Sequence, residues 1–527
     1  MNNLMTKYNN SLSSSRDITK ELGSLNVLPG KNLTQALEVE VGTSKISIWK
    51  IFEVIVAIHY MPDQKHNKFK NFYRLARSHV ISFYDALKNS FNNKHSRFKN
   101  HLKSENVFFL GFTGYLAYEN FDLIFDEILA DKKYKPFWID DIDVSDYSKD
   151  KEHINSKKIH NKSIRRNAHR IKKDINKQLN NIVKAIRPKI STNPKLRLLL
   201  STIEYLKPLI LNVLAQDISR AYYLLSYYSP SAIISIDVAD PRNRIFTLLA
   251  NNLDIPVIQI QAGAINQECI EWSFCYDDLM LSHGPHVKDE LVKLGFDKNK
   301  IIETGSSKIE KSINTMQSKR RVLRDRFNIN DDKVLILFLT SYIDLFDTQK
   351  ILNNQKTVYR DIYYSVIEEV KNNPNLSLII KPHPLEKKHQ LKEHSNESLA
   401  NQNIKVANPS DNSSEMMSGA DVIVSFGSTA TIDAIVYGKP VICPKFHDFP
   451  LNKYIEESNA VLVPKNAQEL NYIFEMIDQG NLSEIINQCK NGREIFLKDF
   501  TNLNSSPTKK IVSCIYKTKT HEKTTQI

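Results

Sequence analysis

Short apolar runs that end abruptly in polar residues recur along the chain, and stretches with helical periodicity separate them. Such runs are typical of buried parallel strands, whose last residues deliver side chains to the carboxyl edge of a sheet. The pattern predicts strands at 106–112, 231–237, 255–261, 279–282, 300–303, 333–341, 378–381 and 421–424. Helices are predicted between them, among others at 118–129, 242–253, 286–294 and 429–437. This order predicts an α/β fold with parallel sheets, and ligands bind at the carboxyl edge of such sheets.

The chain has 527 residues, which is more than one hydrophobic core usually supports. Its start is rich in Ser, Asn and Leu without periodicity, and this predicts disorder. From these changes in pattern we predict the following segments: disorder at 1–45, a helical extension at 46–104, a first Rossmann-like domain at 105–318 with a basic helical insertion at 151–228, a second Rossmann-like domain at 319–482, and C-terminal helices at 483–527 that cross back to the first domain.

The segment Ser-Phe-Gly-Ser-Thr at 425–429 joins a predicted strand to a predicted helix. The free backbone N–H groups and the dipole at a helix start favour an anion. The hydroxyls of Ser425, Ser428 and Thr429 can add donors to phosphate oxygens, and Gly427 lets the backbone come close. Taken alone, the segment is equally well explained as an ordinary N-cap turn.

A second polar segment, Lys-Pro-His-Pro at 381–384, ends another predicted strand. His383 can donate to a phosphate or a leaving group, and Lys381 adds positive charge beside it. Thr340 and Ser341 emerge at the same edge and are secondary phosphate candidates. Two unrelated turns seldom match one site, so the pair predicts a site for a nucleotide monophosphate or diphosphate.

These two segments, with Ala-Ile-Val-Tyr-Gly-Lys-Pro-Val-Ile at 434–442, resemble the C-terminal domain of GT-B glycosyltransferases that build bacterial capsule and lipopolysaccharide chains. Polysialyltransferases, Kdo transferases and CDP-glycerol glycerophosphotransferases share a His-Pro motif and a Ser/Thr-rich turn of this kind. The resemblance implies two Rossmann-like domains facing a cleft, with the nucleotide donor on the second and the acceptor on the first. It places the donor phosphate on His383 and the 425–429 turn. Asp433 stands where many relatives carry Glu for the ribose, and its carboxylate can accept from ribose hydroxyls.

The first domain departs from the pattern of these relatives, which often read Gln-His-Gly and later Gly-x-Pro-Lys. Here 261–263 reads Gln-Ala-Gly and 305–308 reads Gly-Ser-Ser-Lys. The Ala replaces a His that is proposed to act on the acceptor hydroxyl in glycerophosphotransferases, which counts against that activity. The acceptor-side candidates are Gln261, Gly263, Gly111 and Gly114, although a tight strand-to-helix turn explains the last two equally well.

An inverting sugar transfer needs a base near the acceptor hydroxyl. Strand ends of the first domain offer Asp237, Asp240, Glu268 and His283. We favour Asp237 and Glu268, with a turn or capping role as the alternative for each.

Metal binding is not predicted. Asp277 and Asp278 are adjacent, and adjacent residues on a strand point to opposite faces. The acidic stretch 140–143 suits a solvated loop, and no Cys or His cluster has the spacing of a zinc site. We therefore predict no metal and no cofactor, because a nucleotide-sugar is a substrate.

Positive charge is concentrated between residues 151 and 190, where 13 Lys or Arg face 2 acidic residues, while the whole chain carries +13. Within this segment seven apolar residues recur every three or four positions, as on one face of a helix: Ile164, Ala168, Ile171, Ile175, Leu179, Ile182 and Ile186. Such a helix either lies on anionic lipid, guides a polyanionic glycan, or packs its apolar face on the first domain with a solvated basic face. No nucleic-acid recognition motif accompanies it.

Five scattered cysteines do not suggest a disulfide framework. No signal peptide and no apolar stretch long enough to cross a bilayer is evident. We therefore predict a cytoplasmic protein, with possible contact to the inner face of the cell membrane through 151–190.

The sequence thus predicts a glycosyltransferase that moves a sugar from a nucleotide-activated donor to a surface polysaccharide or lipopolysaccharide. A CMP- or CDP-linked donor is favoured over a UDP- or GDP-linked one. The acceptor is a glycan, either free or linked to a lipid. The alternatives are a glycerophosphotransferase or a nucleotide-sugar 2-epimerase on the same fold, and a scaffold protein that kept the fold without the chemistry.

Overall fold

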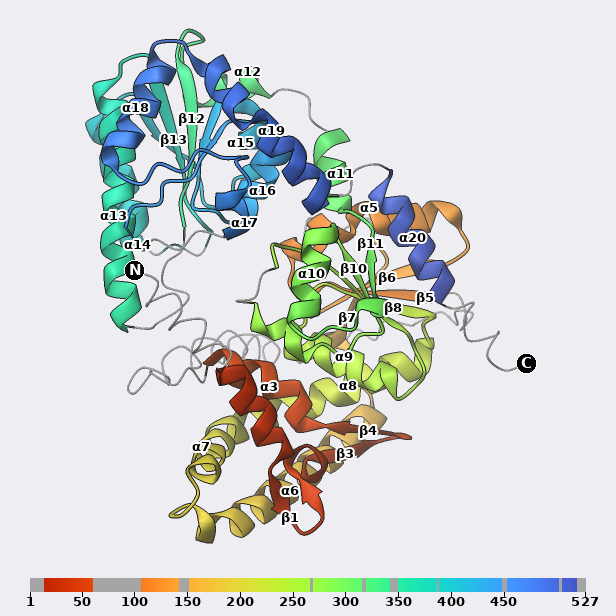
Figure 1. The fold of residues 1–527 in the computed structure, drawn as a ribbon. Helices are drawn as coiled ribbons and strands as arrows, with labels where there is room; N and C mark the ends of the chain where they lie inside the picture. Colours follow the sequence, from red (N-terminus) through yellow and green to blue (C-terminus); the bar gives the residue numbers. More distant parts are fainter. Residues whose placement is uncertain are drawn as a thin grey trace. The chain divides into compact units, whose positions relative to one another are not determined.

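The computed structural model describes residues 14–59, 106–141, 151–265, 269–314, 319–341, 349–384, 386, 388–447, 453–501 and 505–518. They divide into two compact units (Figure 1). The N-terminal unit runs to Ser282 and also holds Val287–Ser307 and the chain from Pro507. The C-terminal unit holds His283–His286 and Lys308–Ser506.

The N-terminal unit contains a seven-stranded sheet whose neighbouring strands are all parallel, in the order β11-β10-β9-β8-β5-β6-β7. Its strands are β5 (Asn106–Leu110), β6 (Lys135–Asp140), β7 (His153–Asn155), β8 (Ala232–Ser235), β9 (Val257–Ile260), β10 (Leu279–Ser282) and β11 (Ile301–Glu303).

Helices cover both faces of this sheet, because alternate strand residues point to opposite sides. On β5, Val107 and Phe109 pack in one core with residues of α5 (Tyr115–Asp131) and α20 (Pro507–Thr518). Phe108 and Leu110 pack in another core with residues of α8 (Ala215–Tyr228) and α9 (Pro241–Asn251).

The C-terminal unit contains a five-stranded parallel sheet in the order β14-β13-β12-β15-β16. Its strands are β12 (Val334–Leu339), β13 (Leu376–Lys381), β14 (Ile404–Val406), β15 (Val422–Val424) and β16 (Val441–Ile442). Around it lie α12 (Arg320–Phe327), α13 (Gln349–Asn372), α14 (Lys388–Ala400), α15 (Ser413–Gly419), α16 (Thr429–Val436), α17 (Lys453–Glu457), α18 (Ala467–Asp478) and α19 (Leu482–Thr501). The predicted fold class, α/β with two Rossmann-like parallel-sheet domains, is confirmed.

The boundaries differ in detail from the predicted ones. The units separate between Ser307 and Lys308, within α11 (Ser307–Asn314), and not at 318–319. Of the C-terminal helices, α19 stays in the C-terminal unit, while α20 lies in the N-terminal unit. There the Tyr516 ring of α20 lies 4.9 Å from the Tyr134 ring, between ring centroids.

Residues 14–45 are ordered, which corrects the disorder predicted for 1–45. After a helix over 14–24 come β1 (Asn26–Leu28), β2 (Lys31–Asn32), α2 (Leu33–Ala36), β3 (Glu38–Val41), β4 (Ser44–Ser47) and α3 (Ile48–His59). The strands among these elements are too short for a periodic signal: β3 alternates exposed and buried residues, but over only four positions. The predicted helical extension at 46–104 is described only as far as α3, and its remainder lies outside the described residues.

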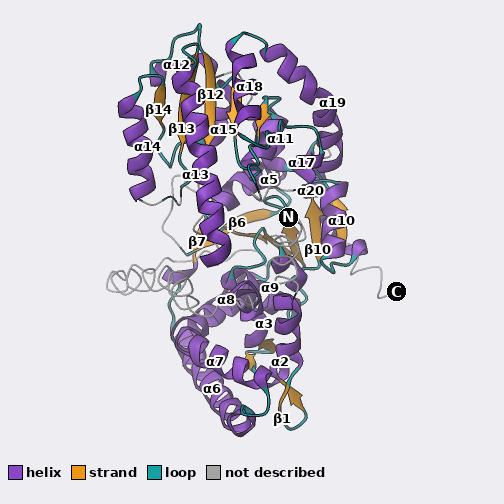
Figure 2. Cartoon of the chain, turned by 60° about the vertical axis from the view of Figure 1, so that its left-hand side comes forward, coloured by secondary structure: helices purple, strands orange, loops and turns teal. Residues whose placement is uncertain are grey.

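The basic segment forms α6 (Lys162–Ile186), followed by α7 (Pro194–Leu209), a π-helical turn (Ile210–Leu214) and α8. Figure 2 shows these helices beside α2, α3 and β1. The seven apolar residues predicted on one face of α6 are all buried, each at most 9% exposed. Six of them join the core that holds Trp49, Phe52 and the inner face of the sheet. The apolar face of α6 is therefore part of the protein core.

Candidate functional site

Three predicted segments meet at the carboxyl edge of the C-terminal sheet. Strands β13, β12 and β15 are direct neighbours. They end at Lys381, Leu339 and Val424, so the residues that follow each strand come out side by side. The edge therefore carries Thr340, Ser341, His383 and the 425–429 turn.

His383 is held there by a polar network beneath it. Its backbone N–H donates to Thr340 Oγ1 at 3.1 Å and to Glu386 Oε1 at 2.9 Å. Glu386 Oε2 lies 2.7 Å from His394 Nε2, and His394 Nδ1 lies 2.8 Å from the Tyr363 hydroxyl. The Thr340 hydroxyl also donates to Glu386.

The ionisation of this network follows from its burial. The Glu386 side chain is 0% exposed. Burial alone would raise its pKa, but hydrogen bonds from His394, Thr340 and the His383 backbone hold the pKa below its ordinary value. Burial lowers the pKa of His383, so its imidazole is neutral at pH 7 and can donate through one N–H. The prediction missed Glu386 and His394, although the spacing His383-Pro-Leu-Glu386 is that of a carboxylate reaching back to a backbone N–H.

Lys381 points into the protein and not along the surface. It is 3% exposed, and its ammonium donates to the carbonyl oxygens of Pro382 and Pro409, both at 2.9 Å. Burial lowers its pKa. Lys381, predicted to add positive charge beside His383, therefore also fixes the backbone there.

The 425–429 turn has one inward and several outward groups. Ser425 is 1% exposed and its hydroxyl bonds to that of Thr431. Gly427 has φ +72°, a conformation that favours glycine. Ser428 is exposed at the N-cap of α16, and its hydroxyl makes no capping hydrogen bond. Ser428 and half-buried Thr429 thus stand at the helix start, while Ser425 braces the turn from inside.

Asp433 has a partner that the prediction missed. Its Oδ2 accepts from Lys308 Nζ at 3.0 Å, and the two side chains are only 10% and 14% exposed. Lys308 ends the Gly-Ser-Ser-Lys segment at 305–308. The segment had been noted only as a departure from relatives, yet it delivers a cation to the predicted donor site.

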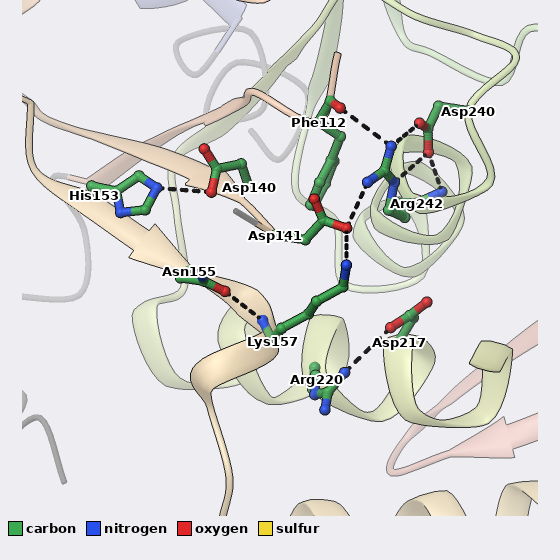
Figure 3. Close-up of polar contacts among 10 residues, drawn as sticks. All are labelled: Phe112, Asp140, Asp141, His153, Asn155, Lys157, Asp217, Arg220, Asp240 and Arg242. Atoms are coloured by element: carbon green, nitrogen blue, oxygen red, sulfur yellow. Dashed lines mark hydrogen bonds and ion pairs between the residues drawn. The ribbon is translucent and has the colours of Figure 1, made fainter. Parts of the chain in front are cut away.

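A charged network lies at the carboxyl edge of the N-terminal sheet (Figure 3). Arg242, near the start of α9, donates to Asp240, to Asp141 Oδ2 at 2.7 Å and to the Phe112 carbonyl at 3.2 Å. Lys157 reaches Asp141 from the other side, 2.6 Å away. Burial would raise the pKa of Asp141, but Arg242 and Lys157 hold it below its ordinary value. Arg242 thus ties the loop after β5 to the ends of β6 and β8.

The local structure explains why both positions of that loop, 111 and 114, are glycine. A Cβ on Gly111 would lie 2.2 Å from Trp138 Nε1, so only glycine fits there. Gly114 has φ +62° and open space around its Cα, as a tight turn into α5 requires. Gln261 is fully buried and donates to the Gly263 carbonyl at 2.7 Å.

Of the predicted bases, Asp237 lies at the end of β8. Its Oδ1 accepts from the backbone N–H of Ala239 at 2.8 Å and of Asp240 at 3.1 Å. Burial, and then the Asp240 charge, raise the pKa of Asp237 to about 6. Glu268 lies outside the described residues.

A second carboxyl group near Asp237 was missed. Glu271 lies in the 3-10 helix η4 (Ile270–Phe274), and burial raises its pKa to about 7, with Asp237 adding to the rise. The other candidates differ: Asp240 is engaged by Arg242, and His283 is 6% exposed.

Within the described ranges, no group of three or more His, Cys, Asp or Glu residues is placed to hold a metal ion. Among the described helices, none combines the length and the apolar character that a membrane span requires.

Comparison with known proteins gives one family match. Residues 274–468 match the family model of CDP-glycerol:poly(glycerophosphate) glycerophosphotransferases. This stretch holds β10 and β11 and the whole five-stranded sheet, with His383 and the 425–429 turn. No curated protein matches the chain.

Three solved structures have a similar fold. The UDP-GlcNAc 2-epimerase of Neisseria meningitidis, bound to UDP-GlcNAc, has 15% identity and a TM-score of 0.49, covering 79% of this chain and 100% of its own. Staphylococcus aureus MnaA with UDP has 12% identity and a TM-score of 0.48, covering 78% and 95%. A glycosyltransferase of Rickettsia africae has 13% identity and a TM-score of 0.47, covering 79% and 98%. The chain therefore carries, over residues 274–468, a domain similar to those of a transferase family.

Proposed function

We propose that the protein is a glycosyltransferase that moves a sugar from a nucleotide-activated donor, of the CMP or CDP type, to a surface polysaccharide or lipopolysaccharide. The observation that carries the proposal is the meeting of His383 with the exposed start of α16 at one sheet edge. The family match over the same residues supports a transferase that releases a nucleotide.

The donor phosphate would lie against the start of α16. Backbone N–H groups and the helix dipole there attract an anion, Gly427 allows close approach, and Ser428 and Thr429 add hydroxyl donors. His383, neutral at pH 7, would donate one hydrogen bond to a phosphate oxygen. These fixed dipoles stabilise the charge that develops on the leaving phosphate, and no metal is needed for that purpose.

In the transfer, the bond between the anomeric carbon and the phosphate oxygen breaks, and the nucleotide leaves with the electron pair. The acceptor oxygen forms the new bond from the opposite face, so the reaction inverts the anomeric centre. The acceptor proton passes to a base, for which we propose Asp237. A carboxyl group with a pKa of about 6 is largely ionised at pH 7, yet is basic enough to take a proton.

The experiment is thermal unfolding of the purified protein with millimolar CMP, CDP, UDP and GDP. A ligand that binds only the native state must raise its stability, by about 3 kcal/mol at a hundredfold excess over Kd. We expect one nucleotide to stabilise the wild type and to have no effect on Ser428→Ala or His383→Ala. Ser414→Ala, at the start of α15, is the matched control and should keep the response. No response of the wild type to any nucleotide would favour a scaffold role.

A second candidate, CDP-glycerol glycerophosphotransfer, is favoured by the family match. The same edge would hold the CDP moiety, and the glycerophosphate would move in place of a sugar. Ala262, where those relatives carry a His, counts against it. Labelled CDP-glycerol and CMP-sugars, offered separately with a polysaccharide acceptor, distinguish the two by which label enters the polymer. A nucleotide-sugar 2-epimerase would instead convert its donor with no acceptor present.

We also propose that α6 holds the protein against an anionic membrane at the inner face of the cell membrane, where a lipid-linked glycan would be found. Eight exposed basic residues lie on α6: Lys162, Arg165, Arg166, Arg170, Lys172, Lys173, Lys177 and Lys184. The helix has one acidic residue, Asp174. Because the apolar face is buried, contact with lipid would be electrostatic, at roughly 1 kcal/mol per basic residue near the surface.

Vesicle sedimentation tests this contact. We expect binding to phosphatidylglycerol vesicles and not to phosphatidylcholine vesicles, with release by 0.5 M NaCl. The triple variant Arg166→Gln, Arg170→Gln, Lys173→Gln should bind at least tenfold more weakly. A control that neutralises the exposed Arg321, Lys490 and Lys498 should bind like the wild type. Binding that survives high salt would mean insertion of apolar groups and would contradict the proposal.

A further inference from the structure

A small open pocket lies on the N-terminal unit, and none of its lining residues belongs to the charged network of Arg242. Its volume is about 230 Å³, smaller than typical pockets for drug-sized ligands at about 300–1,000 Å³. Its walls come from the helix over 14–24, from α2 and α3, and from η4 and the two residues after it. The cavity is therefore of a size for one small molecule, and it forms where the N-terminal layer docks on η4.

Trp49 supplies an unused donor in this wall. Trp49 is only 3% exposed, and its indole Nε1–H has no hydrogen-bond partner in the described structure. Gly23 faces it: a Cβ at that position would lie 2.7 Å from Nε1. Buried indole N–H groups normally find an acceptor. The absence of a side chain at Gly23 thus leaves room beside this donor.

Two hydroxyl groups of the wall donate hydrogen bonds to the backbone. The Thr34 hydroxyl donates to the Gly23 carbonyl at 3.0 Å, and the Ser24 hydroxyl donates to the Lys20 carbonyl at 3.2 Å. Each hydroxyl hydrogen is thus engaged in a hydrogen bond, and both oxygens keep lone pairs that can accept from hydroxyls of a ligand.

The charges of the wall select the sign of the ligand. Glu53 is paired, since its Oε1 accepts from Arg244 at 2.7 Å and from the Tyr276 hydroxyl at 2.5 Å. Lys20 is exposed at the rim, with its ammonium 5.6 Å above the Phe274 ring. The net unpaired charge at the cavity is therefore positive. With the Trp49 N–H, it suits an anionic group.

We propose that this cavity binds a small hydroxylated anion, such as a polyol or sugar phosphate. Its anionic group would lie between Lys20 and the Trp49 N–H, and its hydroxyls would donate to Thr34 and Ser24. The site is separate from the donor site proposed above and does not depend on the transferase activity.

Occupation of this site would affect the candidate base through Arg244. Arg244 donates to Glu53 in the cavity wall, to the Phe274 carbonyl of η4 at 2.9 Å, and to the Val238 carbonyl at 3.0 Å. Val238 directly follows Asp237. A ligand that holds α3 on η4 would therefore also steady the loop that carries Asp237, as an effector would.

Isothermal titration of the full chain with sn-glycerol 3-phosphate, glucose 6-phosphate, inorganic phosphate and glycerol tests the site. We expect saturable binding of at least one of the two organic phosphates, weaker binding of inorganic phosphate, and none of glycerol. Lys20→Gln and Trp49→Phe should each weaken the binding at least tenfold. Trp138→Phe, which removes an indole N–H bonded to Asp140 elsewhere in the same unit, should not change it.

Two further variants separate this site from the others. Ser428→Ala should bind the organic phosphate like the wild type, although it loses the nucleotide response at the donor site. Gly23→Ala should abolish binding, because its methyl group would lie 2.7 Å from Nε1 and crowd this donor. The proposal would be overturned if the wild type shows no saturable binding. It would also be overturned if Lys20→Gln and Trp49→Phe bind the ligand as tightly as the wild type does.

Discussion

The position of His383 rests on one buried carboxylate, and its removal is the most informative perturbation of the donor site. Glu386 accepts from the His383 backbone N–H, from the Thr340 hydroxyl and from His394. In Glu386→Ala these donors lose their common acceptor. The His383 N–H keeps Thr340 Oγ1 at 3.1 Å, and the Thr340 hydroxyl can turn to the Lys381 carbonyl at 3.3 Å.

The loss of stability in Glu386→Ala follows from the number of donors left without an acceptor. Two of the three donors have a second acceptor, so only the His394 side is left unsatisfied, at about 1–3 kcal/mol. A cavity at a fully covered side chain adds about 1 kcal/mol. We expect about 3 kcal/mol in total, or roughly 6–12 °C in the Tm of the C-terminal unit. Glu386→Gln should cost only about 1 kcal/mol, because His394 can change tautomer and accept from the amide.

The assay is thermal unfolding with and without the stabilising nucleotide, followed for both variants. Nucleotide affinity should fall at least tenfold in Glu386→Ala, because the loop that presents His383 loses the contacts of Glu386 with Thr340 and His394. Glu393→Gln is the control, a nearby carboxylate on α14, the helix that carries His394. Its side chain is 33% exposed, so we expect a change below about 1 kcal/mol and an intact nucleotide response. Equal stability and equal affinity in Glu386→Ala and Glu393→Gln would refute this account of the site.

Three further predictions follow from single contacts. Lys308→Met should destabilise the C-terminal unit by about 2–4 kcal/mol by urea unfolding, since it leaves Asp433 buried without its cation, and adding Asp433→Asn should recover part of the loss. Gly111→Ala should cost at least about 2 kcal/mol by the same measurement, because its Cβ meets Trp138 at 2.2 Å. For Asp237 the folded pKa of about 6 lies above the ordinary 3.8, so its ionisation opposes folding. Stability should fall as pH rises from about 4 to 6, by about 3 kcal/mol, and stay lower above that. Asp237→Asn should lack this fall in unfolding measurements, and wild-type kcat/KM should decline below pH 6.

Strand ends were predictable because their signal is local. A buried parallel strand is a short apolar run, and the residue where the run stops is the residue at the sheet edge. This is why Thr340, His383 and the 425–429 turn could be placed at one edge from the chain alone. The N-terminal layer gave no such signal. Its strands β1 to β4 have two to four residues each, which is too short for a period to show.

The partners of the edge residues were not predictable for a different reason. Lys308 lies 125 residues before Asp433, and Arg242 lies 101 residues after Asp141 and 130 after Phe112. Such pairs depend on the order of strands in the sheet, which the sequence does not reveal. The sequence also does not reveal in which direction a side chain points. Ser425 and Lys381 have suitable chemistry for a phosphate, but their backbone turns both side chains inward.

For helix α6, burial distinguishes two interpretations that the same sequence pattern allows. Its apolar spacing fits a core helix and a lipid-bound helix equally, since amphipathicity identifies a face and not what covers it. In the structure that face packs on the core of the sheet. Pulling α6 out of the core to reach lipid would expose residues such as Ile171 and Ile175, both 0% exposed. At about 1.5–3 kcal/mol for each buried aliphatic side chain, that loss exceeds the stability of most domains. Any membrane contact of α6 must therefore use its charges alone, and its salt dependence is the property that a lipid-inserted helix would lack.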